Sequence, residues 1–519
     1  MKDVVVVGAG VAGLVAALEL ARRGMSVTVI ERAGVPGGKV HQRRVGDAAV
    51  DAGPTVFTMR WVFEEIFANA GASLERQLKL TPLDILARHA WGDGPRLDLY
   101  ASRARATDAI AHFAGTTEAR GFGAFLDESR RMYEVLRAPF LEATKPTPFS
   151  LTRRVGLDRL GDLVAIRPFE TLWRSLGRHF RDPRLRQLFA RYATYCGSSP
   201  FQAPATMMLI AHVEQDGVWS IQGGMQRLAA ALESLATLQG VRFRYKTHVR
   251  AVHLARGHVC ALTLESGERL KTDAIVMTAD PAALGAGAFG EEIRAVTHAP
   301  RAAARSLSAV TWAVAARTAG FPLRRHNVFF SGDYAAEFDD LVTRRRMPED
   351  PTIYVCAQDR DERDIVSSDK RERLLVLVNA PADGDTHAMG PEERHACQTN
   401  VFRRLRRSGL AIDVDATNAV MTTPEEFDTR FPHTGGALYG RATHGWAATF
   451  KRPGSRTRIP GLYLAGGGCH PGAGVPMAAL SGRTAARSLL EDADSQRTWR
   501  LVVTPGGTST PSATTVDLA

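Results

Sequence analysis

The chain has 519 residues, 45% of them hydrophobic, and a formal net charge of +11. This length predicts two or three folded units with large buried cores. The basic excess suits an anionic membrane surface, but no basic tract with interleaved aromatic residues occurs, so we expect no nucleic-acid partner. The five cysteines form no C-x-x-C pair, which argues against a metal site or a disulfide framework and predicts a reducing compartment.

The N-terminal segment predicts a strand, a turn, a helix and a second strand. Residues 3–7 are a β-branched run, residues 11–23 are rich in Ala and Leu, and residues 26–30 suit a strand after Gly24. Glycines at dinucleotide-fold spacing favour a buried strand and helix here over a signal peptide. Elsewhere no run reaches ~18 uninterrupted apolar residues, so we expect no transmembrane helix.

The turn after the first strand carries the pattern G-x-G-x-x-G at residues 8–13. Gly8 permits a tight turn, Gly10 leaves room for a pyrophosphate, and Gly13 lets helix and strand pack closely. The helix N-terminus offers free N–H groups to phosphates, and Glu31 ends the second strand, where it can bind ribose hydroxyls. The context predicts an α/β fold with a Rossmann-like domain. The cofactor-binding residues expected in this unit are Gly8, Gly10, Val11, Ala12, Gly13 and Glu31.

A second match to the pattern, at residues 285–290, lacks this context. Pro281 separates it from the preceding strand, and no acidic residue closes a second strand at the right distance. We therefore expect a surface turn at this position and no separate NAD(P)H domain.

The segment after Glu31 favours FAD over NAD. Residues 37–39 are Gly-Gly-Lys, residues 51–55 are Asp-Ala-Gly-Pro-Thr, and Ala17, Leu20, Gly24, Val27 and Val29 keep set intervals before them. This pattern resembles the amine oxidase and phytoene desaturase superfamily of flavoproteins. The resemblance implies that the loop after Glu31 runs along FAD and that the Gly-Pro-Thr turn approaches the isoalloxazine. It adds as cofactor-binding residues Arg32, Gly38, Lys39, Gly53, Pro54 and Thr55.

Residues 113–212 are expected to be helical and rich in Arg. Within residues 151–192, ten Arg and four acidic residues alternate with apolar ones, including Leu157, Leu160 and Phe169. Two interpretations remain open: a basic surface that docks on anionic lipid headgroups, or ordinary helices with solvated faces. Glu214 and Asp216 flank this region, either as proton acceptors or as solvated or capping residues.

Short strands return at residues 241–278, and residues 305–430 mix strands with a helix at 391–408. Residues 463–477 then repeat the order strand, Gly-rich loop, helix. A helix starting near Pro476 points its positive end at the loop and stabilises the negative charge of a reduced flavin. We expect the neighbouring His470 to be structural, and Cys469 not to be a covalent flavin anchor.

Within this superfamily, three stretches resemble bacterial carotenoid desaturases in particular: residues 219–225, 248–252 and 470–474. Residues 51–59, together with 437–441 and 475–483, resemble hydroxyneurosporene (1-hydroxycarotenoid 3,4-) desaturases more than phytoene desaturases. Carried over by position, the resemblance implies that Val249 contacts the adenine through its backbone. It also implies that the flavin is lined by Gly467, Gly468, Pro476 and Met477.

The resemblance implies an FAD-dependent enzyme that desaturates an acyclic carotenoid at C3–C4, at the cytoplasmic side of the inner membrane. The alternatives are a phytoene desaturase, a carotenoid isomerase or saturase, and, in another class, an escort protein of the GDP-dissociation-inhibitor type. The sequence identifies neither a catalytic base nor the electron acceptor. The expected parts are a split FAD domain (1–90, 216–300, 435–491), a helical cap within 91–215, a mixed-sheet substrate domain (301–434) and a disordered tail (492–519).

Overall fold

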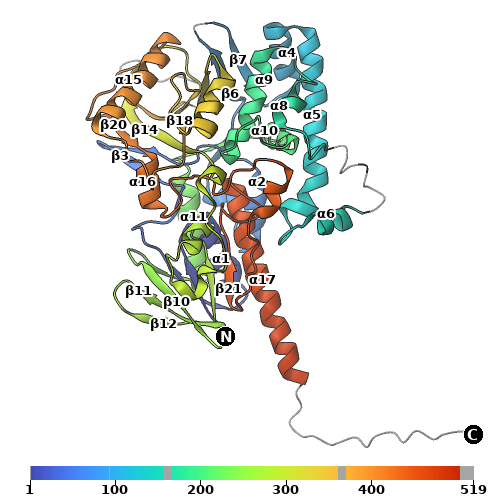
Figure 1. The fold of residues 1–519 in the computed structure, drawn as a ribbon, viewed down its shortest axis with the longest axis vertical. Helices are drawn as coiled ribbons and strands as arrows, with labels where there is room; N and C mark the ends of the chain where they lie inside the picture. The colour runs from blue at the N-terminus through green and yellow to red at the C-terminus, as the bar shows by residue number, and fades with distance from the viewer. Residues whose placement is uncertain (1, 93, 157–160, 162–165, 361–369, 503–519) are drawn as a thin grey trace, which may run out of the picture.

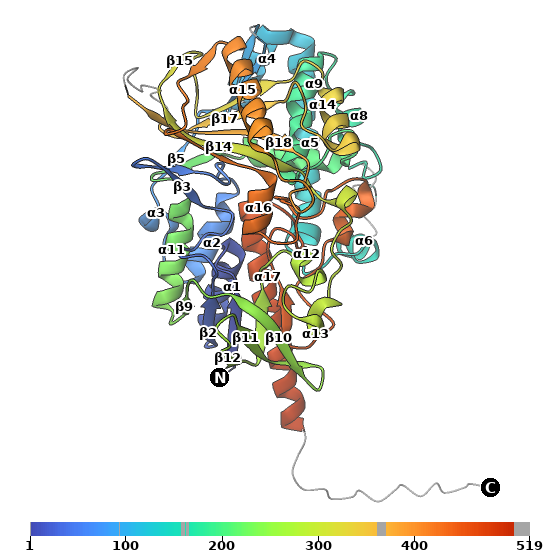
Figure 2. The same ribbon diagram turned by 60° about the vertical axis from the view of Figure 1, so that its left-hand side comes forward.

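The computed structural model describes residues 2–92, 94–156, 161, 166–360 and 370–502. The elements are arranged in two lobes, one above the other, and helix α17 (Val475–Val502) projects from the lower one. The chain passes between the lobes repeatedly, so each lobe is assembled from segments far apart in sequence (Figures 1 and 2).

The lower lobe is organised by the N-terminal unit that the sequence predicts. Strand β1 (Asp3–Val7) and strand β2 (Ser26–Ile30) pair in parallel, and α1 (Val11–Ala21) connects them. The alternative of a signal peptide is wrong for this apolar run, because α1 is buried on nearly all sides. It packs against α17 and against α11 (Gln226–Leu238).

Within the described residues, β1 and β2 belong to a five-stranded sheet of order β21-β13-β1-β2-β9, in which every pairing is parallel. The other three strands are β9 (Arg242–Arg244), β13 (Ala274–Met277) and β21 (Leu462–Leu464). This sheet therefore unites the N-terminal, middle and C-terminal segments, which confirms the Rossmann-like fold class. Helices and antiparallel strands surround this sheet or lie between it and the upper lobe: β3 (Gln42–Val45), β4 (Ala48–Asp51), α2 (Arg60–Asn69), α3 (Leu74–Gln77), β5 (Leu80–Pro82), β8 (Trp219–Ile221), β10 (Val249–Ala255), β11 (His258–Leu264), β12 (Arg269–Lys271), α12 (Pro281–Gly285) and α13 (Glu291–Arg294).

The upper lobe contains a seven-stranded mixed sheet, counted over the described residues, of order β20-β14-β18-β17-β16-β6-β7. Its strands are β6 (Ile85–Trp91), β7 (Arg96–Tyr100), β14 (Ser308–Ala316), β16 (His326–Phe330), β17 (Ile353–Ala357), β18 (Glu372–Ala380) and β20 (Ala419–Thr422). Helix α15 (Pro391–Arg407) covers one face, and the other face turns toward the helical cap and the lower lobe (Figure 2).

Along these strands, successive side chains point alternately into the core and into an internal cavity. Leu374, Val376 and Val378 of β18 pack in the core beneath α15, whereas the intervening Leu375 and Leu377 line an internal cavity. Successive side chains of a strand point to opposite faces, so this period of two decides which residues a bound molecule meets. Tyr354 of β17 is on the cavity side for the same reason, between Ile353 and Val355 of the core.

The helical cap lies beside the sheet, as the Arg-rich pattern of residues 113–212 predicts (Figure 1). Phenylalanines form its core: Phe122 and Phe125 of α5, Phe189 of α9 and Phe180 of the loop before α9 are connected by ring contacts. Its elements are α4 (Arg103–Ala114), α5 (Thr116–Leu136), η1 (Arg137–Leu141), α6 (Pro148–Val155), α8 (Leu172–Leu176), α9 (Pro183–Ala190), η3 (Arg191–Cys196), η4 (Ala205–Met208) and α10 (Leu209–Gln215).

Two expected boundaries fall inside elements. The boundary after residue 90 cuts β6, which pairs with β16 and β7 and so belongs to the upper sheet. The boundary after residue 491 cuts α17, which continues to Val502 because no Gly or Pro occurs between Gly482 and Pro505. The expected disorder of residues 503–519 lies outside the described residues, as do Leu157, Arg159 and Leu160. Among the described helices, none is long and apolar enough to cross a membrane.

Candidate functional site

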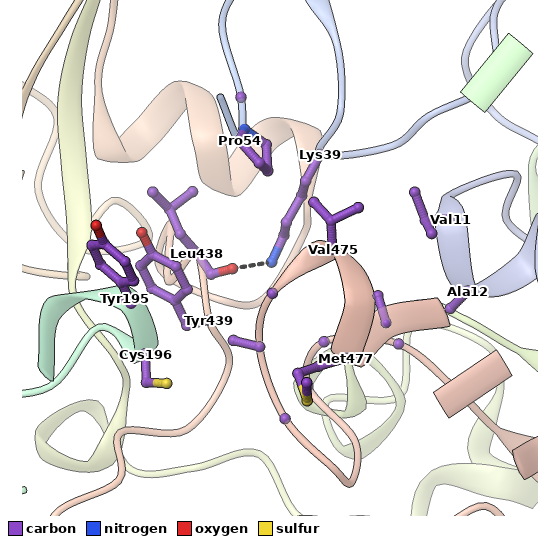
Figure 3. A pocket seen from close by; sticks show the side chains of 18 of the residues that line it. Val11, Ala12, Lys39, Pro54, Tyr195, Cys196, Leu438, Tyr439, Val475 and Met477 are labelled. Atoms are coloured by element: carbon purple, nitrogen blue, oxygen red, sulfur yellow. Dashed lines mark hydrogen bonds between the residues drawn. The ribbon is translucent and has the colours of Figure 1, made fainter. Parts of the chain in front are cut away.

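A cavity of about 710 Å³ extends from the first βα turn of the lower lobe to the sheet and cap of the upper lobe. It is lined by residues of the N-terminal, middle and C-terminal segments together. Of the seventeen residues that the sequence predicts for the cofactor site, all except Gly13 line it. Figure 3 shows Lys39 and Pro54 on one side of this space and the loop before Met477 on the other.

The three glycines of the first turn serve different needs. A Cβ on Gly8, whose φ is +105°, would lie 2.3 Å from the Thr278 hydroxyl, and one on Gly13 would lie 2.0 Å from the Gly8 carbonyl oxygen. Gly13 therefore permits helix–strand packing and does not reach the cavity. Gly10 has an ordinary extended φ of −69°, and its Cβ would meet nothing within 4 Å. That empty space is the cavity itself, where a pyrophosphate would pass.

Glu31 is held at the end of β2 by two backbone N–H groups. Its Oε2 accepts from Ala9 at 2.7 Å and its Oε1 accepts from Ala33 at 2.7 Å, so the carboxylate is oriented at the cavity wall. A carboxylate can accept further bonds on its remaining lone pairs, as ribose recognition requires. Thr247 donates its N–H to the Glu31 carbonyl at 2.9 Å, which places Val249 at the same end of the cavity.

The loop after Glu31 is hydrogen-bonded to residues 430–438, which come from a distant part of the chain. Lys39 Nζ donates to the Leu438 carbonyl at 2.5 Å, and Arg32 donates to the Arg430 carbonyl at 2.5 Å (Figure 3). Burial lowers the pKa of Lys39, and the nearby Asp280 carboxylate opposes that shift. The loop predicted to run along a cofactor is therefore fixed by tertiary hydrogen bonds to residues about 400 positions away in sequence.

The Gly-Pro-Thr turn is packed tightly against the same loop. A Cβ on Gly53 would lie 1.9 Å from the Lys39 carbonyl oxygen, so only glycine fits there. The hydroxyl of Thr55 forms a 2.7 Å hydrogen bond with that of Tyr354, a residue of the upper sheet that the sequence analysis missed. This bond joins the Gly-Pro-Thr turn, residues 53–55, to the lobe that would hold a substrate. We call residues 53–55 the flavin-side turn.

The C-terminal loop depends on a buried arginine that the sequence analysis also missed. Arg452 donates to the carbonyl oxygens of Gly467 (2.9 Å), Tyr439 (3.0 Å) and Arg441 (2.7 Å). Its side chain lines the cavity and only 4% of the residue is exposed. No local pattern distinguishes this Arg from the many others in the chain, because its partners are backbone oxygens of distant loops.

Helix α17 begins beside the loop, with Pro476 and Met477 in its first turn. The N-termini of α1 and α17 both face the cavity, and each presents unpaired N–H groups and a partial positive charge. Together they suit a ligand with a negatively charged phosphate group near one helix and an electron-rich ring near the other.

His470 and Cys469, which adjoin the C-terminal Gly-rich loop, are both buried. His470 donates its Nε2–H to the Phe140 carbonyl at 2.8 Å, and burial lowers its pKa to about 4, so its imidazole is neutral and structural. Cys469 is buried in the core and does not line the cavity. All five cysteines are free. No group of three or more His, Cys, Asp or Glu side chains that could hold a metal occurs among the described residues.

Two expectations need correction. Residues 286–289 do form a turn, but Ala288 and Phe289 line the cavity, and Val252 donates to the Phe289 carbonyl at 2.9 Å. The turn is therefore only partly at the surface: Ala286 is exposed, whereas Phe289 is buried against β10. Glu214 is not solvated: it is buried and accepts from the hydroxyls of Tyr192 (2.8 Å) and Tyr195 (2.5 Å), whereas Asp216 is exposed and follows α10 as its C-cap.

A split Rossmann-like lobe, two helix N-termini facing one cavity and a mixed-sheet lobe above them define a flavoprotein oxidoreductase of the amine oxidase type. The chain belongs to the flavin-containing amine oxidoreductase family, whose model matches residues 11–490. FAD is accordingly its cofactor, and the open space at Gly10 fits that assignment.

Related proteins cover the chain almost completely. It is 52% identical over 517 residues to a hydroxyneurosporene desaturase of Rubrivivax gelatinosus, covering 99% of this chain and 98% of the relative. It is 44% identical to a hydroxyneurosporene desaturase of Cereibacter sphaeroides, covering 95% and 98%. A phytoene desaturase of Neurospora crassa is 27% identical, covering 95% and 85%. The predicted resemblance to carotenoid desaturases is confirmed.

Solved structures support the fold. A redesigned putrescine oxidase has a TM-score of 0.60 at 14% identity, covering 95% of this chain and 99% of that one. An oxidoreductase from Methanosarcina mazei has a TM-score of 0.58 at 13% identity, covering 94% and 100%. At these identities the likeness concerns the fold alone.

Proposed function

We propose that this protein is an FAD-dependent desaturase that introduces the C3–C4 double bond into acyclic 1-hydroxycarotenoids of the hydroxyneurosporene type. The observation that carries the proposal is the 52% identity, over nearly the whole of both chains, to a hydroxyneurosporene desaturase. The cavity supports it, because beyond the flavin cradle its walls are mainly apolar. These walls include Leu136, Phe140, Leu209, Ile210, Val213, Leu375 and Leu377.

Bound FAD supplies a two-electron oxidant that can accept a hydride. In the substrate, C4–H is allylic to the conjugated polyene, so hydride loss from C4 leaves a cation that is delocalised along the chain. Loss of a proton from C3 to water or to a modest acceptor then completes the double bond. The protein's contribution is to exclude bulk water and to hold C3 and C4 in register.

The rival functions differ in which molecule is bound and in whether it reacts. A phytoene desaturase or an isomerase would act on phytoene or on an existing polyene, and an escort protein of the GDP-dissociation-inhibitor type would bind lipid without redox change. The intact glycine cradle at both ends of the chain favours an enzyme. Flavin bleaching by the substrate would exclude the escort protein.

The carotenoids that accumulate in bacteria expressing the chain show which substrate it converts. Expressed in bacteria that make 1-hydroxyneurosporene, the chain is expected to add one double bond next to the existing conjugation, which shifts absorption to the red. Phytoene, with its short conjugation, gives a less delocalised cation and is expected to stay unconverted. Chromatography of pigment extracts measures both. Efficient turnover of phytoene with no change in the hydroxylated carotenoid would contradict the substrate assignment and leave the flavin chemistry intact.

We further propose peripheral association with the cytoplasmic face of an anionic membrane. Three large side chains lie at the surface near the cap: Phe149 (79% exposed), Phe169 (76%) and Trp446 (41%). The rings of Phe169 and Trp446 are 5.2 Å apart, and Trp446 also lines the cavity, so this apolar patch adjoins a route to the interior. Arg153 and Arg154 of α6 are exposed beside Phe149. Exposed aromatic and basic residues together suit a lipid interface.

Membrane partitioning tests this proposal. The double substitution Phe149→Ser and Phe169→Ser is expected to weaken binding to anionic liposomes roughly tenfold or more, because each ring loses its transfer from water. Arg153→Gln with Arg154→Gln is expected to weaken binding at low ionic strength only, since salt screens that contribution. Leu238→Ser is the matched control, as Leu238 is 80% exposed on α11 of the lower lobe. If all variants sedimented equally with the liposomes, the cap would have an ordinary solvated surface and the membrane proposal would be wrong.

A further inference from the structure

Charged and tyrosine side chains gather on one part of the upper cavity, whose other walls are mainly apolar. They come from η3 and α10 of the cap, from α14 (Tyr334–Phe338) and from β17 of the sheet. We call them the polar patch, which consists of Arg191, Tyr195, Glu214, Tyr334, Glu337 and Tyr354. Buried polar groups cost free energy unless they are paired, so such a patch in an apolar tunnel calls for a partner.

The cap side of the polar patch holds a buried cation with spare donors. Arg191 Nη2 donates to the Tyr195 hydroxyl at 3.0 Å, and that hydroxyl donates to Glu214 at 2.5 Å. Among the described residues, Arg191 Nε is buried and has no hydrogen-bond partner. A guanidinium has five N–H donors, so Arg191 retains capacity to bind an oxygen atom inside the cavity.

The sheet side holds a second unused donor. Tyr334 is only 6% exposed, and within the described part of the chain its hydroxyl has no hydrogen-bond partner. Its ring is fixed by contacts with the rings of Trp173 and Phe338, at centroid distances of 6.3 and 5.0 Å. The neighbouring Glu337 carboxylate accepts from Ser331 and Thr352 and makes no hydrogen bond with this hydroxyl. Burial, with the Glu337 charge, raises the pKa of Tyr334 well above 10, so the hydroxyl stays a donor.

Hydrogen bonds connect the polar patch to the flavin-side turn. Tyr354 bonds through its hydroxyl to Thr55 at 2.7 Å and to His326 Nδ1 at 2.7 Å. His326 and Tyr334 both interact electrostatically with Arg191. The polar patch is therefore close to the turn that approaches the isoalloxazine and is not at a remote end of the tunnel.

The proposed substrate requires a polar group at this place. Its hydroxyl oxygen is bonded to C1, and C3 is two bonds further along the chain. With bond lengths of roughly 1.5 Å, this oxygen lies only about 3–4 Å from C3 and at most about 5 Å from C4. Holding C3–C4 against the flavin must therefore place the hydroxyl next to the flavin-side turn.

On the basis of the proposed function, we infer that the polar patch binds the C1 hydroxyl of the substrate, with Arg191 and Tyr334 as donors to its oxygen. Binding there sets the register of C3–C4 against the flavin. A carotenoid without the hydroxyl leaves both donors buried and unpaired, which disfavours it far more than the missing contact alone. Arg191 and Tyr334 are therefore specificity-determining residues.

Tyr334→Phe is the sharpest test. The substitution keeps the ring and removes a hydroxyl that has no protein partner, so folding and flavin content are expected to be unchanged. The rate ratio of 1-hydroxyneurosporene to neurosporene, which lacks the hydroxyl, is expected to fall roughly five- to tenfold. Quenching of tryptophan fluorescence gives the matching ratio of binding constants, since Trp173 adjoins Tyr334. Arg191→Gln is expected to lower both ratios on the order of tenfold or more, as a charged donor is lost.

Tyr192→Phe is the matched control. Tyr192 shares Glu214 with Tyr195 but does not line the cavity, so its loss should lower stability and leave both ratios unchanged. Unaltered ratios in Tyr334→Phe and in a flavin-loaded Arg191→Gln would overturn the inference. A wild-type protein that converts phytoene and ignores both test carotenoids would instead overturn the proposed function. In that case the binding ratio, which needs no turnover, still decides whether the patch recognises a hydroxyl.

Discussion

Gly10→Val is expected to yield a folded protein that purifies without FAD. Gly10 has φ −69° and ψ 170°, which any residue adopts, and a Cβ added there would meet no protein atom within 4 Å. It would instead occupy the space in front of the α1 N-terminus, where the pyrophosphate must approach the backbone. A branched side chain there is expected to weaken FAD binding at least roughly a hundredfold by steric overlap alone. The ratio of flavin absorbance to protein absorbance measures the loss.

Gly390→Val is an unusually close control. Gly390 also precedes a helix, α15, with φ −67° and ψ 167°, and a Cβ there also meets nothing within 4 Å, but the residue is outside the cavity. This variant should retain FAD. Gly13→Ala should behave differently from both, because its Cβ would lie 2.0 Å from the Gly8 carbonyl oxygen and must disturb the fold. Stoichiometric FAD in purified Gly10→Val would contradict the dinucleotide assignment.

Arg452→Met is expected to destabilise the apoprotein by about 3 kcal/mol or more. The methionine fills most of the space but leaves three part-buried carbonyl oxygens without this donor, each at a cost of about 1–3 kcal/mol, partly relieved by relaxation and water. Loosening of Gly467 should also lower flavin occupancy. Urea unfolding followed by circular dichroism measures the first effect and flavin absorbance measures the second.

Two companion variants separate geometry from charge. Arg452→Lys keeps the charge but loses the planar fork that reaches three oxygens, so an intermediate loss of stability is expected. Arg456→Met removes ion pairs with Glu491 and Asp492 that are about half exposed, which should cost no more than about 1 kcal/mol. If Arg452→Met unfolded at the same urea concentration as Arg456→Met, the buried arginine would not be what holds the C-terminal loop.

Prediction from sequence succeeded where the requirement is local. Gly8 and Gly13 must be glycine because a Cβ there would clash within the first βα unit or with the strand beside it, whereas Gly10 leaves space only for the cofactor. Glu31 follows at a spacing set by one helix and one strand. Prediction failed where partners are distant. The turn at 286–289 contains nothing that reveals β10 beside it, and the alternation of β6 does not say which sheet it joins.

The Rossmann-like unit and the FAD cofactor were predictable from the sequence, because short-range backbone constraints produce a recognisable pattern of glycines. The cofactor contacts of the C-terminal loop stay a prediction from resemblance. Which individual polar residues have a role depends on the tertiary structure. Arg452, Tyr334 and Tyr354 are ordinary residues in the sequence, and they acquire roles because loops and strands hundreds of positions apart enclose one cavity. Inside it, water cannot satisfy their hydrogen bonds, so the fold or a ligand must do so.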